Sequence, residues 1–375
     1  MNWADYLIPV NISASRHDSF GEAVVMYKGE PTFNIPETTK IVIIGIPEDR
    51  FSEGAGEIKS PEAIRKQLYS LSSGSRGTVV DMGNLRTGKT LADTYIGLSD
   101  LVSEFYRKKI ITLLIGGTND LFYGNYLAMK DEKAVLTNIA PQLIFSSYCA
   151  HEHPLNAILF DMSGIPLQMC NIGYQSYNVT QEESDYFADR HFEAYRLGEA
   201  RDGNLRTCEP IIRDSDLVSI SMDAVKFSDA PAASHPSPNG FYGEEICQIA
   251  FFAGLSHKCR SLGLFDMIPH NDTHDITAKL AAQIIWYFIE GVKKRYDDYP
   301  IDDDQNFKKY LIYFDELHHN LCFFKNIRTE RWWMEVPSIA DKKNNLILSC
   351  TPEDYLRASE QEIPERWWKT YQRIN

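Results

Sequence analysis

Ile41–Pro47 reads IVIIGIP, an almost unbroken apolar run that a proline closes. A strand that is buried on both faces has such a continuous apolar pattern. A helix start follows after a short loop, because Ser60 precedes Pro61 and Glu62 falls in the first turn. The segment therefore predicts a buried strand, a loop and a helix.

Apolar runs and segments of helical period alternate through the first three quarters of the chain. The predicted strands are Lys40–Ile46, Thr78–Asp81, Ile110–Ile115, Ala134–Asn138, Asp216–Ser221 and Gly263–Met267. The predicted helices are Pro61–Leu71, Leu91–Lys108, Gly243–Leu262 and Ile276–Lys294. Strands that alternate with helices need crossover connections, which produce a mostly parallel sheet with helices on both faces. The fold class is therefore α/β.

The composition is that of a globular protein, with 375 residues, 43% of them hydrophobic and 24% charged. A net charge of −14 argues against a nucleic-acid partner, because binding to phosphates needs clustered Lys and Arg. No export signal and no apolar segment of membrane-spanning length is visible. The seven cysteines are scattered, which suits reduced thiols better than disulfides or a zinc site. We therefore expect a cytoplasmic protein without a nucleic-acid partner or a membrane span.

The chain changes in character after about Tyr296, and we expect three parts. Residues 1–39 form an N-terminal extension that packs on the core, residues 40–295 an α/β domain, and residues 296–375 an aromatic-rich C-terminal extension. The last part contains the tetrapeptide Glu-Arg-Trp-Trp twice, at residues 330–333 and 365–368. Either its tryptophans pack the tail onto the main domain, or they form a partner surface, since Trp and Arg are enriched where binding energy concentrates. These residues are Trp332, Trp333, Trp367 and Trp368.

Several short motifs occur in the order and spacing of a known family. They read IVIIGIP (41–47), GAG (54–56), SPEAIR (60–65), DMGN (81–84), LIGGTND (114–120), SISMDA (219–224) followed by AP (230–231), and FDMIP (265–269) followed by Asp272 and TA (277–278). Over residues 40–295 this ordered set resembles the ureohydrolases, the family of arginase, agmatinase and formimidoylglutamase.

The resemblance implies a three-layer α/β/α sandwich around a mostly parallel sheet of about eight strands. It also implies two manganese ions at the carboxyl ends of the strands, which share a hydroxide that attacks an amidine or guanidine carbon. Two such ions need several carboxylate and imidazole ligands, because they prefer these donors and repel each other.

The positions that match the metal ligands of the family carry mostly neutral side chains. They are Asn119, Asn138, Ala140, Gln142, Ser221 and Asp223. Only Asp223 keeps a carboxylate, and amides and hydroxyls are weaker donors. We therefore expect no cofactor and no catalytic residue, and hence a pseudoenzyme. Manganese is the alternative.

Other groups have been considered for the same pocket or for a relocated metal site. Asp120, Asp223 and Asp266 could line the pocket and hold a cationic ligand such as an amine or guanidinium. The clusters His151–His153 and His270–Asp275 could hold a metal, although a structural or solvated loop explains each of them better, with a helix cap at Asp272 or His274 in the second. No nucleophile elbow and no phosphate-binding loop is present.

The leading hypothesis is a catalytically inactive protein of the ureohydrolase fold that acts as a binding or scaffold subunit. It would assemble as a homo-oligomer or bind another protein through its C-terminal extension. The alternative is a divergent formimidoylglutamase- or arginase-like hydrolase of linear amidine C–N bonds.

Overall fold

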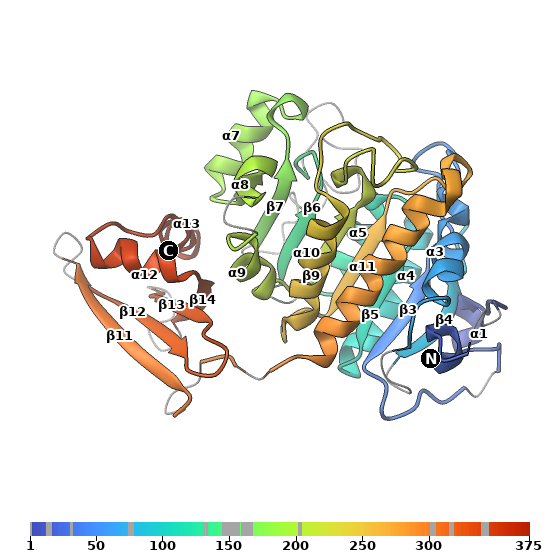
Figure 1. The fold of residues 1–375 in the computed structure, drawn as a ribbon, viewed down its shortest axis with the longest axis horizontal. Coiled ribbons are helices and arrows are strands. Elements are labelled where there is room, and N and C mark those ends of the chain that lie inside the picture. Colours follow the sequence, from blue (N-terminus) through green and yellow to red (C-terminus); the bar gives the residue numbers. More distant parts are fainter. Residues whose placement is uncertain are drawn as a thin grey trace.

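A computed structural model of the chain describes residues 2–12, 17–30, 33–73, 79–130, 132, 134–144, 158, 168–201, 205–296, 298–300, 305–314, 319–338 and 345–375. Within these residues the chain forms a large sheet and a small sheet, each with its own helices (Figure 1). No helix in the described ranges is both long and apolar enough to cross a lipid bilayer.

The large sheet has ten strands in the order β1-β4-β3-β5-β10-β9-β6-β7-β8, with β2 also paired to β4. Its strands are β1 (Leu7–Ile8), β2 (Val25–Met26), β3 (Ile41–Gly45), β4 (Val79–Leu85), β5 (Ile111–Ile115), β6 (Val135–Ile139), β7 (Gln168–Tyr174), β8 (Glu193–Arg196), β9 (Leu217–Ser221) and β10 (Ser261–Phe265). All pairs are parallel except β1 with β4. The parallel run from β4 to β8 has eight strands, which is the number that the resemblance implied, and the short β1 and β2 add to it from the N-terminal residues.

Helices cover both faces of this sheet (Figure 1). They are α1 (Trp3–Tyr6), α2 (Phe20–Ala23), α3 (Ser60–Leu68), α4 (Leu91–Arg107), α5 (Phe122–Leu127), α7 (Gln181–Asp189), α8 (Leu197–Arg201), α9 (Cys208–Arg213), α10 (Gly243–Leu255) and α11 (Ile276–Lys293). On β3, Ile41 and Ile43 pack in a cluster with α3, α10 and α11, whereas Val42 and Ile44 pack in a second cluster with α4 and α5. Because both rows of side chains are buried, β3 is apolar throughout, and the predicted three-layer α/β/α sandwich is confirmed.

The structure differs from the predicted elements in two respects. The strands β7 and β8 were not predicted, because their sequences QMCNIGY and EAYR contain no continuous apolar run. The helix predicted over Gly243–Leu262 ends at Leu255, because Ser256 has an extended backbone and β10 begins at Ser261.

The small sheet lies in the C-terminal part of the chain and is antiparallel. Its strands, in spatial order, are β11 (Phe307–Phe314), β12 (His319–Asn326), β13 (Trp332–Val336) and β14 (Leu346–Cys350). The helices α12 (Pro352–Ser359) and α13 (Glu365–Ile374) contribute to its hydrophobic core. Of the four tryptophans considered as a partner surface, Trp332, Trp333 and Trp367 are buried, and only Trp368 is exposed, by 40%. Trp332 and Trp367 lie in the hydrophobic core of the small sheet itself, whereas the ring of Trp333 lies against Arg213 of α9.

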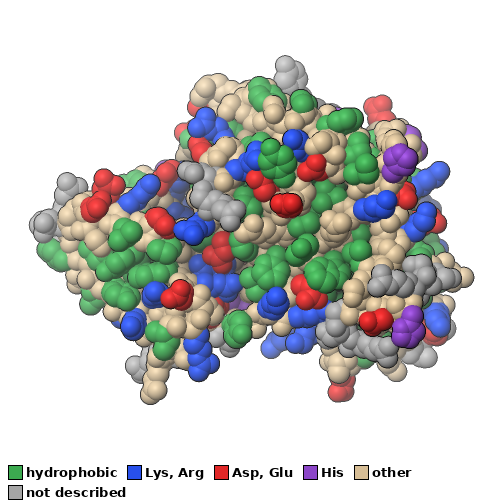
Figure 2. All heavy atoms as spheres, in the orientation of Figure 1, with side chains coloured by type: hydrophobic (Ala, Val, Ile, Leu, Met, Phe, Trp, Pro, Cys, Tyr) green, Lys and Arg blue, Asp and Glu red, His purple; other side chains and the backbone are tan. Residues whose placement is uncertain are grey.

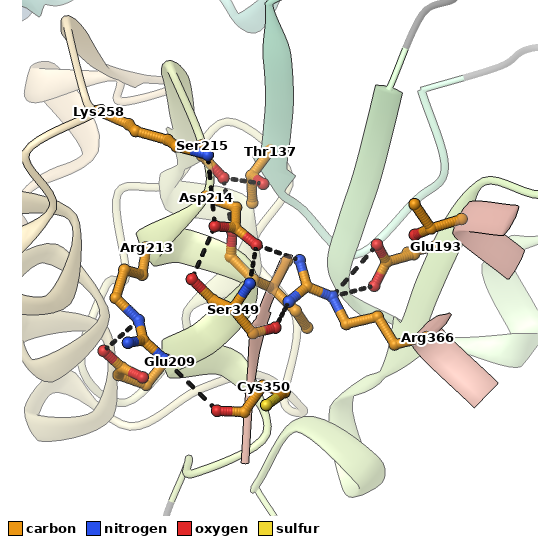
Figure 3. A network of polar contacts seen from close by, with 12 residues as sticks. Thr137, Glu193, Glu209, Arg213, Asp214, Ser215, Lys258, Ser349, Cys350 and Arg366 are labelled. Carbon is orange, nitrogen blue, oxygen red and sulfur yellow. Dashed lines mark hydrogen bonds and ion pairs between the residues drawn. The ribbon is translucent and has the colours of Figure 1, made fainter. Parts of the chain in front are cut away.

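A buried polar network joins the two sheets (Figure 3). The guanidinium of Arg366 on α13 lies 3.0 Å from a carboxylate oxygen of Glu193 on β8 and 3.0 Å from one of Asp214, which precedes β9. It also donates to the carbonyl of Ser349 on β14, whose own N–H and hydroxyl donate to Asp214. The guanidinium of Arg213 on α9 stacks over the ring of Trp333. Charged groups of the main sheet thus fasten the small sheet to it.

Candidate functional site

The loops at the carboxyl ends of β5, β6, β9 and β10 surround a cavity of about 600 Å³. Parallel strands bring their carboxyl ends to one edge, which is where ligands bind in open α/β sheets. The positions matched to the family's metal ligands and the three aspartates predicted for the pocket all line this cavity. They are Asn119, Asp120, Asn138, Ala140, Gln142, Ser221, Asp223 and Asp266.

A chain of hydrogen bonds joins the neutral side chains at the strand ends. Ser219 donates to Oδ1 of Asn119, whose Nδ2 donates to Oδ1 of Asn138 over 3.3 Å. Nδ2 of Asn138 donates to Oδ1 of Asn171 over 3.0 Å, and Nδ2 of Asn171 donates to the carbonyl of Ala140 over 3.3 Å. The register of β6 and β7 places Asn138 directly beside Asn171. Each asparagine therefore uses its oxygen, the atom that a cation would need, to accept from a neighbour.

The one carboxylate at these positions, Asp223, is held by His235. Its Oδ1 accepts from the backbone N–H of His235 over 2.7 Å, and its Oδ2 lies 3.0 Å from Nδ1 of the imidazole. The hydrogen bond to Asp223 raises the pKa of His235 to about 8. An imidazolium–carboxylate pair therefore forms at neutral pH. The sequence did not predict this role for His235, because no motif marks this isolated histidine.

Asp266 follows β10 and has a left-handed backbone with φ of 65°. Non-glycine residues seldom adopt this conformation, and such residues gather at functional sites. Its carboxylate is buried and accepts from the backbone N–H of Asn119 over 2.8 Å and from the hydroxyl of Ser221. Burial, and after it the charge of Asp223, raises the pKa of Asp266 to about 8. The carboxyl group is therefore mostly protonated at neutral pH.

Asp120 is the third buried aspartate of the cavity. Its carboxylate accepts hydrogen bonds from the hydroxyls of Thr118 and Tyr95. Burial raises the pKa of Asp120 to about 6, against the opposite effect of those two hydrogen bonds. The side chain is thus mostly ionised at neutral pH.

The cavity as a whole is acidic. Five of its lining residues are carboxylic acids, against one imidazolium at His235, and none of the described lining residues is a Lys or an Arg. The acids are Glu57, Asp120, Glu183, Asp223 and Asp266. The sequence analysis missed Glu57 and Glu183, which no spacing connects with the strand ends. The arrangement favours a cationic occupant.

The other metal candidates have separate outcomes. Asp272 accepts from the backbone N–H groups of Thr277 and Ala278, over 2.9 and 2.8 Å, so it caps the start of α11 as one interpretation of this loop required. The cluster His151–His153 lies outside the described residues. Over the described ranges, no group of three or more His, Cys, Asp or Glu side chains is placed to hold a metal ion.

Curated relatives of this chain are formimidoylglutamases. That of Staphylococcus haemolyticus is 24% identical over 277 residues, which cover 68% of this chain and 88% of the relative. That of Staphylococcus carnosus is 25% identical over 249 residues, with 62% and 79% covered.

Solved structures of formiminoglutamase and formimidoylglutamase have a fold similar to that of this chain. Trypanosoma cruzi formiminoglutamase, solved with Mn²⁺, has a TM-score of 0.64 at 22% identity, with 71% of this chain and 97% of that chain covered. Formimidoylglutamase from Bacillus subtilis has a TM-score of 0.64 at 16% identity, with 77% and 97% covered. These likenesses show the fold.

The expectation of no cofactor is wrong, because the similar Trypanosoma cruzi structure was solved with Mn²⁺. The reasoning failed because it treated the six matched positions as the whole basis for metal binding. The described side chains do not fit a pair of such ions. The amide oxygens of Asn119, Asn138 and Asn171 accept hydrogen bonds from Ser219, Asn119 and Asn138, and both oxygens of Asp223 accept from His235. Two divalent ions need more anionic donors than these positions supply.

The family is shown by a match over the main sheet. Residues 39–290, more than half of the chain, match the model of the arginase family. This range contains the eight parallel strands and the acidic cavity, and it excludes the small sheet. The chain therefore belongs to the arginase family, as a formimidoylglutamase-like member whose fold is that of the ureohydrolases.

Proposed function

We propose that this chain is a non-hydrolytic member of the arginase family that binds a cationic ligand of the amine, amidine or guanidine class in its acidic cavity. The observation that carries the proposal is the excess of acids in the cavity: five carboxylic acids stand against the one imidazolium of His235, and no Lys or Arg is among the described lining residues. A buried carboxylate forms its strongest hydrogen bonds with a cationic donor. We also infer a cytoplasmic location, since the six described cysteines are free thiols.

The hydrogen-bond chain supports the absence of two-metal hydrolysis. Asn119 donates to the oxygen of Asn138, Asn138 donates to that of Asn171, and Asp223 is paired with His235. An amidine carbon needs a strong nucleophile, which two-metal enzymes generate by lowering the pKa of a shared water. Because the positions matched to the family's metal ligands supply a single carboxylate, we infer that the cavity binds an organic cation and does not generate the hydroxide that hydrolysis needs.

Calorimetric titration with arginine, agmatine and formimidoylglutamate tests the binding proposal. We expect at least one of them to bind, and Asp120→Asn to weaken that binding about 10- to 100-fold, the effect of losing a charged hydrogen bond of 1.5–3 kcal/mol. Asp189→Asn, an exposed acid at the end of α7, should leave the affinity unchanged. No heat with any of the three compounds would refute the proposal.

A second candidate is a divergent manganese hydrolase, which the Trypanosoma cruzi structure with Mn²⁺ favours. Metal analysis after manganese loading and desalting separates the two. On the leading proposal, we expect fewer than two equivalents per chain and no release of ammonia, urea or formamide from the three compounds. Two tightly bound equivalents together with product release would establish the hydrolase instead.

A further inference from the structure

The strand β11 is an edge of the small sheet and has eight residues, which read FKKYLIYF. It pairs with β12 along its whole length, and no strand in the described part of the chain pairs with its other side. The small sheet also lies outside the residues that match the arginase family. An exposed edge of this length is a template for pairing with another strand.

The hydrogen bonds around β11 show which backbone groups face outward. Ile327 N–H donates to the carbonyl of Asn306 over 2.8 Å, so that carbonyl points toward the β12 side. The side chain of Gln361 donates over 3.0 Å to the carbonyl of Tyr313, which points to the opposite side. Backbone groups alternate in direction along an antiparallel strand. The odd-numbered residues of β11, including Leu311, therefore direct their backbone N–H and C=O groups away from β12.

The side chains of β11 divide in the same way. Tyr310, Ile312 and Phe314 pack toward the core of the small sheet. Leu311 and Tyr313 point to the other face and are 62% and 52% exposed. Figure 2 shows hydrophobic side chains at the surface of the lobe that carries this sheet. An apolar row beside an open strand edge marks an interaction surface.

We propose that β11 pairs antiparallel with β11 of a second copy of this chain, about a two-fold axis at Leu311. In this register Leu311 lies opposite its own symmetry mate, and Lys309 lies opposite Tyr313. In each of these pairs both residues direct their backbone N–H and C=O groups outward, so each strand donates hydrogen bonds to the other and accepts hydrogen bonds from it. The four-stranded sheets of the two copies join into one continuous sheet, with both helical layers on the same side.

Charge argues against one alternative register and supports this one. Centring the axis on Lys309 would set two ammonium groups directly opposite each other, which destabilises a strand pair. Centring it on Leu311 places each Lys309 beside an aromatic ring of the other copy, a favourable cation–π geometry. In this pairing the carbonyl of Tyr313 accepts a hydrogen bond from a backbone N–H of the second copy in place of the one from the side chain of Gln361. The surface is complementary to itself, as a two-fold interface requires, and this favours a second copy over a foreign peptide.

Light scattering coupled to size exclusion tests the proposal at several protein concentrations and 150 mM salt. We expect the full-length chain to reach an even number of copies, and Leu311→Lys to halve it. Leu356→Lys, which changes a leucine that is 58% exposed on α12, should leave the assembly intact. A monomer at every concentration, or an assembly that Leu311→Lys does not alter, would overturn the proposal.

A second variant tests the register itself. Leu311→Cys places two thiols opposite each other with Cβ atoms about 5 Å apart. A short bismaleimide reagent should therefore link two chains of this variant and not two chains of Leu356→Cys. If both variants, or neither, form the linked dimer, the two-fold register at Leu311 is wrong.

Discussion

Replacing Arg366 with methionine is expected to lower the free energy of unfolding by about 3–5 kcal/mol, the usual cost of removing one partner from a buried ion pair. Burial opposes the charge of Arg366, but Glu193 and Asp214 outweigh it and raise its pKa. Without the guanidinium, Glu193 and Asp214 stay buried with fewer partners (Figure 3). Urea unfolding of the full chain, followed by tryptophan fluorescence, measures the loss. The buried Trp332 and Trp333 report on the small sheet.

Lys369→Met is the matched control for Arg366→Met. Lys369 lies on the same helix and pairs with Glu365, but its side chain is 34% exposed and that of Glu365 is 74% exposed. Exposed pairs contribute about 0–1 kcal/mol, so this variant should unfold close to the wild type. Arg366→Lys keeps the charge and loses the two-pronged donor geometry, and we expect an intermediate loss. If Arg366→Met and Lys369→Met unfold alike, the network does not fasten the two sheets.

Asp266→Asn is expected to change how stability depends on pH. The folded protein holds the pKa of Asp266 at about 8, above an unfolded value near 4. Between these values the folded state binds a proton that the unfolded state has lost, so stability falls as pH rises, by about 1.4 kcal/mol per unit. The stabilising contribution is complete below about pH 4 and lost above pH 8. Asparagine does not titrate, so Asp266→Asn removes this slope. The free energy of unfolding of the variant, relative to that of the wild type, therefore rises by about 4 kcal/mol between pH 5 and pH 8.

The measurement is the free energy of unfolding of both proteins at pH 5, 6, 7 and 8. His235 adds a slope of the same sign in both, because its folded pKa of about 8 lies above its unfolded value near 6.5. That stabilisation is present below about pH 6.5 and is lost as pH rises through 8. Asp189→Asn should follow the wild type throughout. Parallel curves for Asp266→Asn and the wild type would show that Asp266 is ionised across this range.

Most of the large sheet was predictable because its central strands are buried on both faces. Ile41–Gly45 has no polar side chain and Ile111–Ile115 has only Thr112, and this pattern has few explanations besides a central parallel strand. The strands β7 and β8 were missed since they carry polar side chains. Asn171 on β7 is polar because it pairs with Asn138 on β6, a contact that spacing along the chain does not reveal.

The candidate site was predictable as a set of positions and not as a set of interactions. The ordered motifs located the strand ends, and the structure places all of the chosen residues around one cavity. The expectation of no cofactor failed, because it rested on residue types at matched positions alone. His235 was missed, although it is the residue that engages Asp223.

The chemical inventory of the site follows from the sequence by itself: amides at Asn119 and Asn138, a hydroxyl at Ser221, and carboxylates at Asp223 and Asp266. Only the tertiary structure decided which of these groups carry charge and which bond to one another. A hydrogen bond needs two atoms about 3 Å apart, and a pKa depends on how much water and which charges surround the group. The pKa of Asp266 is raised because the residue is buried beside Asp223, and that proximity arises only when β9 and β10 pair.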